Sequence, residues 1–479
     1  MDNEIRLSPR RNRMPENLRH IHLMGICGTG MASLAGILKE TGFSVTGSDR
    51  NIYPPMSHFL KALSIPVIEG YGPDNLTAGP DLVIVGNVIT KDNPEAVELS
   101  RLGLPYLSFP QAINRFALKD KRSIVISGTH GKTTTSSIVA WILEKAGMDP
   151  GFMIGGIPLN FQKNFKLGEG DFFVIEGDEY DTAFFDKGPK FLHYSPWAAI
   201  ITSIEFDHAD IYRDLDHIIT SFKKLIAIMP PTGILIGNGD DPVVAREMEK
   251  AKCPAQTYGL TENCLWRAED IIVESDITRF VVLKGEKEYM TLSTPLYGRH
   301  NICNLLSAVV LADFLGIPPP ILSGALMDFK GVKRRQEITG EKRGIILLDD
   351  FAHHPTAVRE TIRAVREKYK DRRLVAVFEP RSNSSRRNIF QTQYASSFDN
   401  ADLVMLAEPS LIDKIPPAER FSSKGLARDL NKKGINAFFF ENSDQLLDAM
   451  IIEARSGDVI LIMSNGAFDN IHQRLLKQL

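Results

Sequence analysis

Short runs of apolar residues alternate along this chain with longer stretches in which apolar positions recur every three to four residues. One short run, Ser123–Ser127, leads into a glycine-rich turn, and helical spacing of apolar residues then continues from Ile138 to Ala146. The first pattern predicts a buried strand and the second a helix that packs against it. Their repeated alternation predicts an α/β fold, with largely parallel sheets flanked by helices.

This pattern falls into three blocks, and we expect one domain from each: residues 18–117, 118–329 and 330–479. At 479 residues the chain is too long for a single core, which agrees with about three domains. Within the middle block, short alternating runs between residues 270 and 292 predict antiparallel strands beside the main sheet. Residues 1–17 are polar and basic and are predicted to be a disordered tail.

The composition argues against several classes of protein. A net charge of −3, with 24% charged residues, gives no reason to expect a nucleic-acid partner. The four cysteines lack metal-ligand spacing, so neither a zinc site nor a disulfide framework is expected. There is no run of about 18 apolar residues and no signal-peptide pattern. We therefore expect a cytoplasmic protein that does not insert into a membrane.

The glycine-rich turn reads Gly-Thr-His-Gly-Lys-Thr from Gly128 to Thr133. A glycine turn between a strand and a helix lets backbone N–H groups face an anion. Lys132 adds a positive charge, and the Thr133 hydroxyl can hold Mg²⁺. Ile126 stands where a full Walker motif has its first glycine. The turn predicts a site for a nucleoside triphosphate.

Two further strands predicted for the middle block end near residues that can bind a metal. Glu176 closes the apolar run that starts at residue 171, and His208 lies just beyond the run at residues 198–203. An acid directly after a core strand, downstream of a Lys-Thr loop, is expected to be a second Mg²⁺ ligand. The alternative is that these residues are simply polar side chains of a solvent-exposed loop. That alternative fits Glu176 and His208 less well than their neighbours, because each lies at or just beyond the end of a strand in the same predicted sheet.

The first block also has a glycine turn. Gly28 and Gly30 open a predicted helix, and Asp49 follows the next strand, as in a dinucleotide-binding unit. Ser33 occupies the place of the third glycine in that fingerprint. A UDP-sugar diphosphate therefore fits the turn as well as NAD does. Asn87 follows another predicted strand, where it either contacts a ligand or caps a turn.

In the last block, three polar clusters follow predicted strands, at residues 349–355, 379–383 and 464–466. Because the carboxyl ends of parallel strands meet at one edge of a sheet, these clusters predict a ligand-binding crevice. The first cluster contains His353 and the second contains Arg381.

In their order along the chain, these motifs resemble the signatures of the Mur ligase family. The resemblance rests on Gly128–Thr135, Glu176–Asp181, Asp207-His208, His300-Asn301 and Asp349–Pro355, and it extends over nearly the whole chain. It implies three α/β domains: a Rossmann-like N-terminal domain, a central P-loop ATPase domain and a Rossmann-like C-terminal domain. These would hold a UDP-sugar, ATP with Mg²⁺, and an amine substrate, respectively.

The resemblance implies an ATP-dependent ligase that forms an amide bond in peptidoglycan metabolism. Segments such as Tyr53–Ser57, Tyr180–Lys187 and Glu379–Asn383 resemble the members that act in cell-wall recycling. Those members join UDP-N-acetylmuramate to L-alanyl-γ-D-glutamyl-meso-diaminopimelate through an acyl phosphate. Ligation of L-alanine to UDP-N-acetylmuramate is the alternative within the family. Two alternatives belong to other functional classes. The first is a nicotinamide-dependent oxidoreductase, which would leave the Lys132 turn unexplained. The second is a nucleotide-gated binding protein, which would perform no ligation.

The resemblance also implies roles for single residues. Those expected in catalysis are Lys132, Glu176, His208 and Arg335, and the expected Mg²⁺ ligands are Thr133, Glu176 and His208. The nucleotide is expected to contact Gly128, Thr129, His130, Gly131, Lys132, Thr133, Thr134, His300, Asn301, Asn304, Arg335 and Asp350. The two other substrates are expected to contact Gly28, Thr29, Gly30, Asp49, Asn87, His130, His353, Arg381 and Asn383. Arg381 and Asn383 are assigned to the diaminopimelate end, because a guanidinium fork suits a carboxylate.

Overall fold

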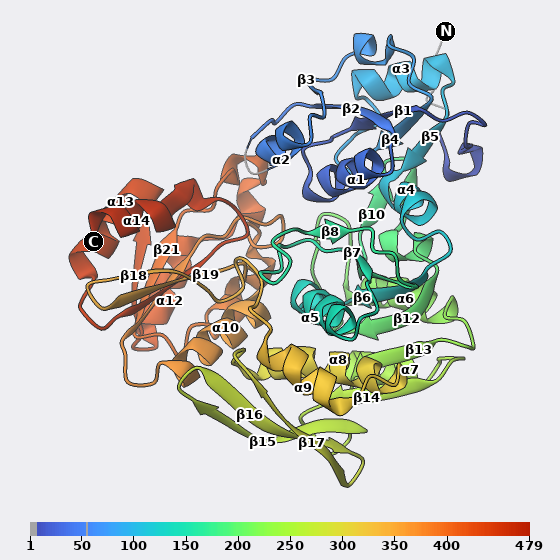
Figure 1. The fold of residues 1–479 in the computed structure, drawn as a ribbon. Coiled ribbons are helices and arrows are strands. Elements are labelled where there is room, and N and C mark those ends of the chain that lie inside the picture. The colour runs from blue at the N-terminus through green and yellow to red at the C-terminus, as the bar shows by residue number, and fades with distance from the viewer. Residues whose placement is uncertain (1–6, 54–55) are drawn as a thin grey trace.

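The computed structural model describes residues 7–53 and 56–479, which form three large sheets with helices around them (Figure 1). In Figure 1 the first unit, in blue, lies above the green and yellow central unit, and the orange and red C-terminal unit lies beside it. The predicted α/β class with three sheets is confirmed.

The first sheet is parallel, with the order β3-β2-β1-β4-β5. Its strands are β1 (His20–Met24), β2 (Ser44–Asp49), β3 (Val67–Glu69), β4 (Leu82–Val85) and β5 (Tyr106–Ser108). The helices around it are α1 (Thr29–Glu40), α2 (Met56–Ala62), α3 (Pro94–Leu102) and α4 (Phe109–Phe116). Because β1 and β4 are neighbours, the turns that follow them open at the same edge.

The central sheet has ten strands, in the order β17-β16-β15-β14-β13-β12-β6-β9-β7-β8. The strands are β6 (Arg122–Ser127), β7 (Gly151–Met153), β8 (Phe165–Lys166), β9 (Phe172–Gly177), β12 (Pro196–Ile201), β13 (Ile234–Asn238), β14 (Ala255–Gly259), β15 (Trp266–Glu274), β16 (Ile277–Lys284) and β17 (Lys287–Thr294). A separate hairpin joins β10 (Asp181–Ala183) to β11 (Asp186–Pro189). The helices are α5 (Lys132–Lys145), α6 (Leu215–Ala227), α7 (Pro242–Met248), α8 (Arg299–Phe314) and α9 (Pro319–Met327).

The third sheet has the order β18-β19-β23-β20-β21-β22, and only its edge strand β18 is antiparallel within the described chain. Its strands are β18 (Glu337–Lys342), β19 (Ile345–Asp350), β20 (Leu374–Phe378), β21 (Leu403–Ala407), β22 (Asn436–Phe440) and β23 (Val459–Met463). Its helices are α10 (Pro355–Lys368), α11 (Gln391–Tyr394), α12 (Ser423–Lys432), α13 (Ser443–Glu453) and α14 (Ile471–Gln478).

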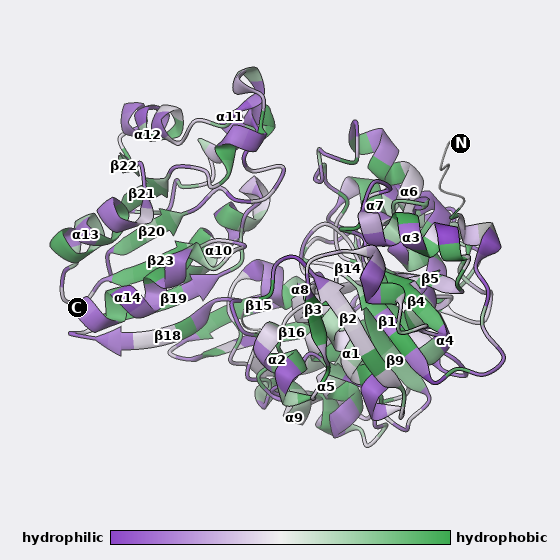
Figure 2. Cartoon of the chain, turned by 90° about the horizontal axis from the view of Figure 1, so that it is seen from above, coloured by the Kyte–Doolittle hydropathy of each residue, from purple (hydrophilic) through white to green (hydrophobic). Residues whose placement is uncertain are grey.

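Strand β6 shows why the apolar runs are continuous rather than alternating. Ile124 and Ile126 pack into a core with Ile138 of α5, whereas Val125 packs into a second core with Phe222 of α6. Helices therefore cover both faces of the central sheet, and both sets of strand side chains are buried. Figure 2 shows the same distribution, with hydrophobic residues concentrated on the sheet strands.

The first unit docks onto the edge of the central sheet through a close helix–strand contact. A Cβ on Gly36 of α1 would lie 2.5 Å from the ring of Phe165, so only glycine leaves room for that ring. Beside it, Asn164 donates a hydrogen bond of 2.8 Å to the Ser33 hydroxyl. Ser33, which replaces the third glycine of the dinucleotide fingerprint, therefore links the two units.

Two expectations need correction. Residues 1–6 of the predicted disordered tail lie outside the described residues, but from residue 7 the segment packs against the first sheet. The backbone N–H and C=O of Ser8 both hydrogen-bond the Tyr106 hydroxyl, and Leu7 joins a hydrophobic cluster there. Strands β15–β17 are antiparallel as predicted, but they extend the main sheet, because β15 pairs in parallel with β14.

In the parts of the chain that the structure describes, no helix combines the length and the apolar character needed to cross a bilayer.

Candidate active site

The glycine-rich turn follows β6, in the middle of the central sheet, and leads into α5. Gly128 has a φ of +133° and Gly131 a φ of +81°, values that disfavour other residues. A Cβ on Gly131 would lie 2.5 Å from the Asn304 side-chain oxygen on α8. The close approach of loop and helix therefore needs glycine, and it places Asn304 beside the start of α5.

Lys132, the first residue of α5, turns its ammonium group into a cluster of acids. Its Nζ donates to the Gly128 carbonyl at 2.6 Å and lies 3.3 Å from Glu179 Oε2. Burial alone would lower the pKa of Lys132, but the carboxylates of Glu179, Asp178 and Glu176 outweigh it and raise that pKa. Lys132 is thus a half-buried cation that is held charged.

The side-chain oxygens of Thr133 and Glu176 lie close together, as two ligands of one metal ion would. The Thr133 hydroxyl is 3.2 Å from Glu176 Oε2, and the backbone N–H of Gly155 donates to Glu176 Oε1 at 2.7 Å. Burial, and then the charge of Asp178, raise the pKa of Glu176. A dication would relieve this excess of negative charge, and hydroxyl and carboxylate oxygens are the ligands that Mg²⁺ prefers. The donor set therefore fits Mg²⁺.

His208 shares the Glu179 carboxylate with Lys132. Its Nε2 is 3.3 Å from Glu179 Oε1, and its φ of +52° is unusual for a residue with a side chain. The structure therefore places His208 with Glu179 rather than with Thr133 and Glu176, which fits a ligand of a second ion. Sequence reasoning missed Glu179, although it lies within the acidic motif after β9.

Arg335 approaches the same pair from the segment that leads into the C-terminal unit. Its Nη2 donates to the Thr133 hydroxyl at 3.3 Å, and its guanidinium lies 4.7 Å from the centroid of the Phe351 ring. A phenyl ring in this place acts as a cation–π platform for the guanidinium. Asp350 accepts the backbone N–H groups of Gln336 and Ala352, both at 2.8 Å, and so holds the Arg335 segment in place.

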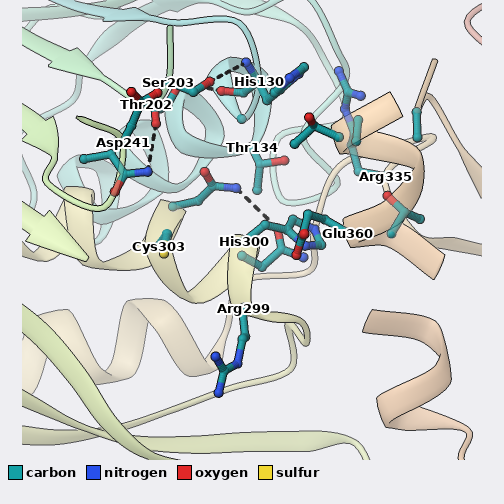
Figure 3. Close-up of a pocket in the computed structure, with 18 of the residues that line it drawn as sticks. His130, Thr134, Thr202, Ser203, Asp241, Arg299, His300, Cys303, Arg335 and Glu360 are labelled. Atoms are coloured by element: carbon teal, nitrogen blue, oxygen red, sulfur yellow. Dashed lines mark hydrogen bonds between the residues drawn. The ribbon is translucent and has the colours of Figure 1, made fainter. Parts of the chain in front are cut away.

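A cavity of about 660 Å³ extends from the turn toward α8 and α10. Figure 3 shows Thr134, His300 and Arg335 around this space. The predicted nucleotide residues on its wall are His130, Gly131, Thr133, Thr134, His300, Asn301, Asn304, Arg335 and Asp350. Gly128, Thr129 and Lys132 lie behind the wall, in the turn itself. Wall residues that the sequence did not indicate include Asn238, Asp240, Tyr258, Arg299 and Glu360.

The end of the cavity at α8 has unused hydrogen-bonding capacity. His300 Nδ1 is buried and has no hydrogen-bond partner among the described residues. Burial lowers the pKa of His300 to about 4, so the ring is neutral near pH 7. Asn301 is fixed by bonds to the Tyr297 carbonyl at 2.9 Å and to Gln336 Oε1 at 3.0 Å. A neutral ring with a free nitrogen suits a base rather than a phosphate.

The predicted residues of the first unit gather at the edge where β1 and β4 end. α1 begins at Thr29, directly after Gly28, and a Cβ on Gly30 would lie 3.0 Å from the Phe109 ring. Asp49 accepts the backbone N–H of Cys27 at 2.9 Å and that of Asn51 at 3.0 Å. Asp49 therefore shapes the turn with both oxygens, while Asn87 is exposed in the turn after β4.

In the C-terminal unit, the predicted crevice forms because β19, β23 and β20 are neighbours. Arg381 Nη1 lies 3.4 Å from Glu379 Oε1, and its side chain is 40% exposed. Asn383 donates to Asp210 of the central unit at 2.8 Å. His353 Nδ1 is 3.0 Å from the Phe351 carbonyl. Arg381 thus has donors to spare, whereas Asn383 is already used to hold two units together.

Lys190 is a buried cation that sequence reasoning overlooked. It lies in the 3₁₀ turn Lys190–His193, where its Nζ is 3.1 Å from Asp178 Oδ2 and 4.0 Å from the centroid of the Tyr180 ring. The same nitrogen is 5.7 Å from the centroid of Phe109, the ring that packs on Gly30. Lys190 therefore stands between the acidic cluster and the first glycine turn.

Three family models match successive parts of the chain. They are the Mur ligase family catalytic domain at residues 20–121, the Mur ligase middle domain at 126–312 and the Mur ligase glutamate ligase domain at 334–466.

Curated relatives match nearly the whole chain. UDP-N-acetylmuramate–L-alanyl-γ-D-glutamyl-meso-2,6-diaminoheptandioate ligase of Escherichia coli (strain K12) is 41% identical over 457 residues, covering 95% of this chain and 97% of that protein. UDP-N-acetylmuramate–L-alanine ligase of Carboxydothermus hydrogenoformans is 33% identical, over 95% of this chain and 96% of that protein. Among solved structures, a murein peptide ligase of Psychrobacter arcticus aligns with a TM-score of 0.72 and 37% identity, over 96% of this chain and 98% of that one.

Proposed function

The chain belongs to the Mur ligase family, and from this premise we propose that it joins UDP-N-acetylmuramate to L-alanyl-γ-D-glutamyl-meso-diaminopimelate at the expense of ATP. The observation that carries the proposal is the contact of Thr133 with both Glu176 and Arg335 at the wall of a nucleotide-sized cavity between the central and C-terminal units, with Lys132 behind that wall. The full-length match to a relative named for this reaction supports the choice of substrates. The proposed setting is peptidoglycan recycling in the cytoplasm.

The proposed division of labour follows the three sheets. Residues 18–117 hold the UDP moiety at the turn Gly28–Gly30, residues 118–329 hold ATP, and residues 330–479 hold the peptide amine. Mg²⁺, when bound, would be held by Thr133 and Glu176, with His208 for a second ion, and would neutralise charge on the phosphates. His300, Asn301 and Asn304 receive the adenine, and Asp350 lies at the ribose end.

The residues of the site are suited to forming an acyl phosphate from two anions. The lactyl carboxylate of the muramate must approach a triphosphate, so positive charge has to be concentrated where they meet. Lys132 and Arg335 supply two half-buried cations there, and His130 of the turn packs against His354 of the C-terminal unit. Phosphate transfer to the carboxylate breaks the terminal P–O bond of ATP and leaves ADP. Attack by the peptide amine then forms the amide bond and releases phosphate, while Arg381 holds a carboxylate of the peptide.

A competition between amines tests the proposal. With UDP-N-acetylmuramate and ATP present, we expect the tripeptide to be ligated in preference to free L-alanine, with one ADP formed for each amide bond. Preference for L-alanine would favour the L-alanine-adding activity named for the 33% identical relative. ADP release that needs no UDP-N-acetylmuramate and no amine would reject ligation altogether.

A further inference from the structure

His130, Glu205 and His354 bring three potential ligand atoms together on the boundary between the central and C-terminal units. Their ligand atoms all lie within 4.8 Å of one another. His130 belongs to the glycine-rich turn, Glu205 follows β12, and His354 is the N-cap of α10. His130 and Glu205 also line the nucleotide cavity. No part of the proposed ligation mechanism requires this combination of two imidazoles and one carboxylate.

The two histidines lie near Glu205 without forming direct hydrogen bonds to it. His130 Nε2 is 3.6 Å from Glu205 Oε1, and His354 Nδ1 is 3.7 Å from Glu205 Oε2. Side-chain hydrogen bonds of this type need about 2.7–3.2 Å. In a tetrahedral site with metal–ligand bonds of about 2.0–2.2 Å, neighbouring ligand atoms lie about 3.3–3.6 Å apart. The two measured distances involve different Glu205 oxygens, and the three ligand atoms lie within 4.8 Å of one another, so the side chains would draw closer together around an ion. Moreover, His130 Nε2 is buried and has no hydrogen-bond partner among the described residues.

The surroundings hold two of the three side chains in the state that a metal requires. His354 Nε2 is 3.2 Å from the Phe206 carbonyl, so it carries the proton and leaves the lone pair on Nδ1. The backbone N–H of Thr356 approaches that lone pair at 3.3 Å, a long contact that a metal bond would replace. The Thr356 hydroxyl donates to Glu205 Oε2 at 2.7 Å. Outer hydrogen bonds of this kind orient the histidines and carboxylates of metal sites.

We propose that His130, Glu205 and His354 form a binding site for a transition-metal dication of the Zn²⁺ type, separate from the Mg²⁺ site at Thr133 and Glu176. Two imidazoles and a carboxylate match the ligand preference of Zn²⁺, whereas Mg²⁺ prefers oxygen ligands alone. His130 and Glu205 line the nucleotide cavity, so water or a phosphate oxygen there would be able to complete the coordination of a bound ion. Because two ligands come from the central unit and one from the C-terminal unit, the bound ion holds these units together.

The test is a titration of tag-free, full-length protein with ZnCl₂ by calorimetry, in the absence of nucleotide, substrates and Mg²⁺. CoCl₂ gives a second readout, since tetrahedral Co²⁺ has a visible absorption spectrum. The two informative variants keep the local structure. Glu205→Gln retains the acceptor for Thr356, and His354→Asn retains an N-cap side chain at the start of α10.

We expect each variant to weaken Zn²⁺ binding at this site by at least about tenfold and to remove the Co²⁺ spectrum. Zn²⁺ should raise the melting temperature of the wild-type protein, because the ion binds only the folded chain, and raise it much less in the variants. His208→Asn, which alters the proposed second Mg²⁺ site, and His217→Asn, at an exposed position of α6, should leave the Co²⁺ spectrum in place.

Unchanged Zn²⁺ affinity in both Glu205→Gln and His354→Asn would overturn the proposal. So would loss of the Co²⁺ signal in His208→Asn alone, because the ion would then occupy the proposed Mg²⁺ site. If the cluster only shares a proton between two imidazoles and a carboxylate, Zn²⁺ will leave the melting temperature of the wild type unchanged. These measurements use no ligase substrate, so they stand or fall independently of the proposed function.

Discussion

The chain contains two strand–turn–helix units that share their order of elements and differ in charge: β1 with α1, and β6 with α5. Each strand has a parallel neighbour on both sides, and each helix begins after a glycine. In both, the helix N-terminus has no side-chain cap among the described residues, whereas Asn93, Asp214 and Asp241 cap α3, α6 and α7. Uncapped N–H groups at a helix start can bind an anion.

The difference lies in the side chains that surround each turn. Lys132, Arg335 and Glu176 lie around the start of α5. Charged side chains therefore surround the place where we propose that the phosphate is transferred. Around the start of α1, Asp49 instead bonds to the backbone and Phe109 packs on Gly30. In the proposed function, both turns bind an anion through their backbone, and the side-chain charges beside the second turn make the difference between holding the anion and reacting with it.

The largest effect should come from Lys132→Ala. We expect kcat to fall by about a thousandfold or more, because a preorganised charge on the transferring phosphate is lost. Binding of UDP-N-acetylmuramate, measured by calorimetry, should remain near the wild-type value, since that anion is assigned to the other turn. Lys145→Ala, at the exposed end of the same helix, is the matched control. If Lys132→Ala lost UDP-N-acetylmuramate binding as well as turnover, the two turns would not act as separate anion sites.

Lys190→Met removes the positive charge that lies between the acidic cluster and the first glycine turn. Asp178 would keep its buried surroundings but lose its partner, and removing one partner of a buried pair costs about 3–5 kcal/mol. Because the Asp178 side chain is 21% exposed, water can partly solvate the unpaired carboxylate. We therefore expect the free energy of unfolding to fall by about 3 kcal/mol or less. Lys187→Met, which removes an exposed pair with Asp181, should change stability by less than about 1 kcal/mol. Equal losses in denaturant unfolding of both variants would contradict this.

Gly30→Val should act on the first turn alone. A Cβ there would lie 3.0 Å from the tip of the Phe109 ring, so a valine side chain must displace that ring or the start of α1. We expect the KM for UDP-N-acetylmuramate to rise about tenfold, equivalent to about 1.4 kcal/mol, with the KM for ATP unchanged. Gly324→Ala, on a helix where a Cβ meets nothing within 4 Å, is the control. A rise in the KM for ATP instead would show that the two turns are coupled.

The smallest effect concerns His300 and pH. Burial lowers the pKa of His300 from 6.5 to about 4, so in this range the unfolded chain binds a proton that the folded chain excludes. The free energy of unfolding should therefore decrease as pH falls from 6.5 toward 4. In His300→Gln this decrease should be smaller, and denaturant titrations at pH 7 and pH 5 measure the difference. Identical pH dependence in the two proteins would show that His300 titrates normally.

Local patterns were enough to predict most of the fold. The run Ser123–Ser127 was predicted as a strand and β6 spans Arg122–Ser127, because a buried apolar run between turn residues has few alternatives. The antiparallel strands β15–β17 were predicted, but not their union with the main sheet, because β14 starts at an exposed alanine and is weakly apolar. The edge strand β18 escaped prediction for a similar reason, since its residues are mainly polar.

The sequence by itself determined the chemistry available along the chain: a glycine turn with Lys132 and Thr133, an acid at the end of β9, and polar clusters after three C-terminal strands. Each of these depends on neighbours in the chain, whose geometry follows from local backbone rules. Only the tertiary structure decided that Glu179 contacts both Lys132 and His208. It also placed Lys190 between the acidic cluster and the first glycine turn. Finally, it brought His354 to His130 and Glu205. Those contacts join segments far apart in sequence, and packing of whole units, rather than local pattern, brings them together.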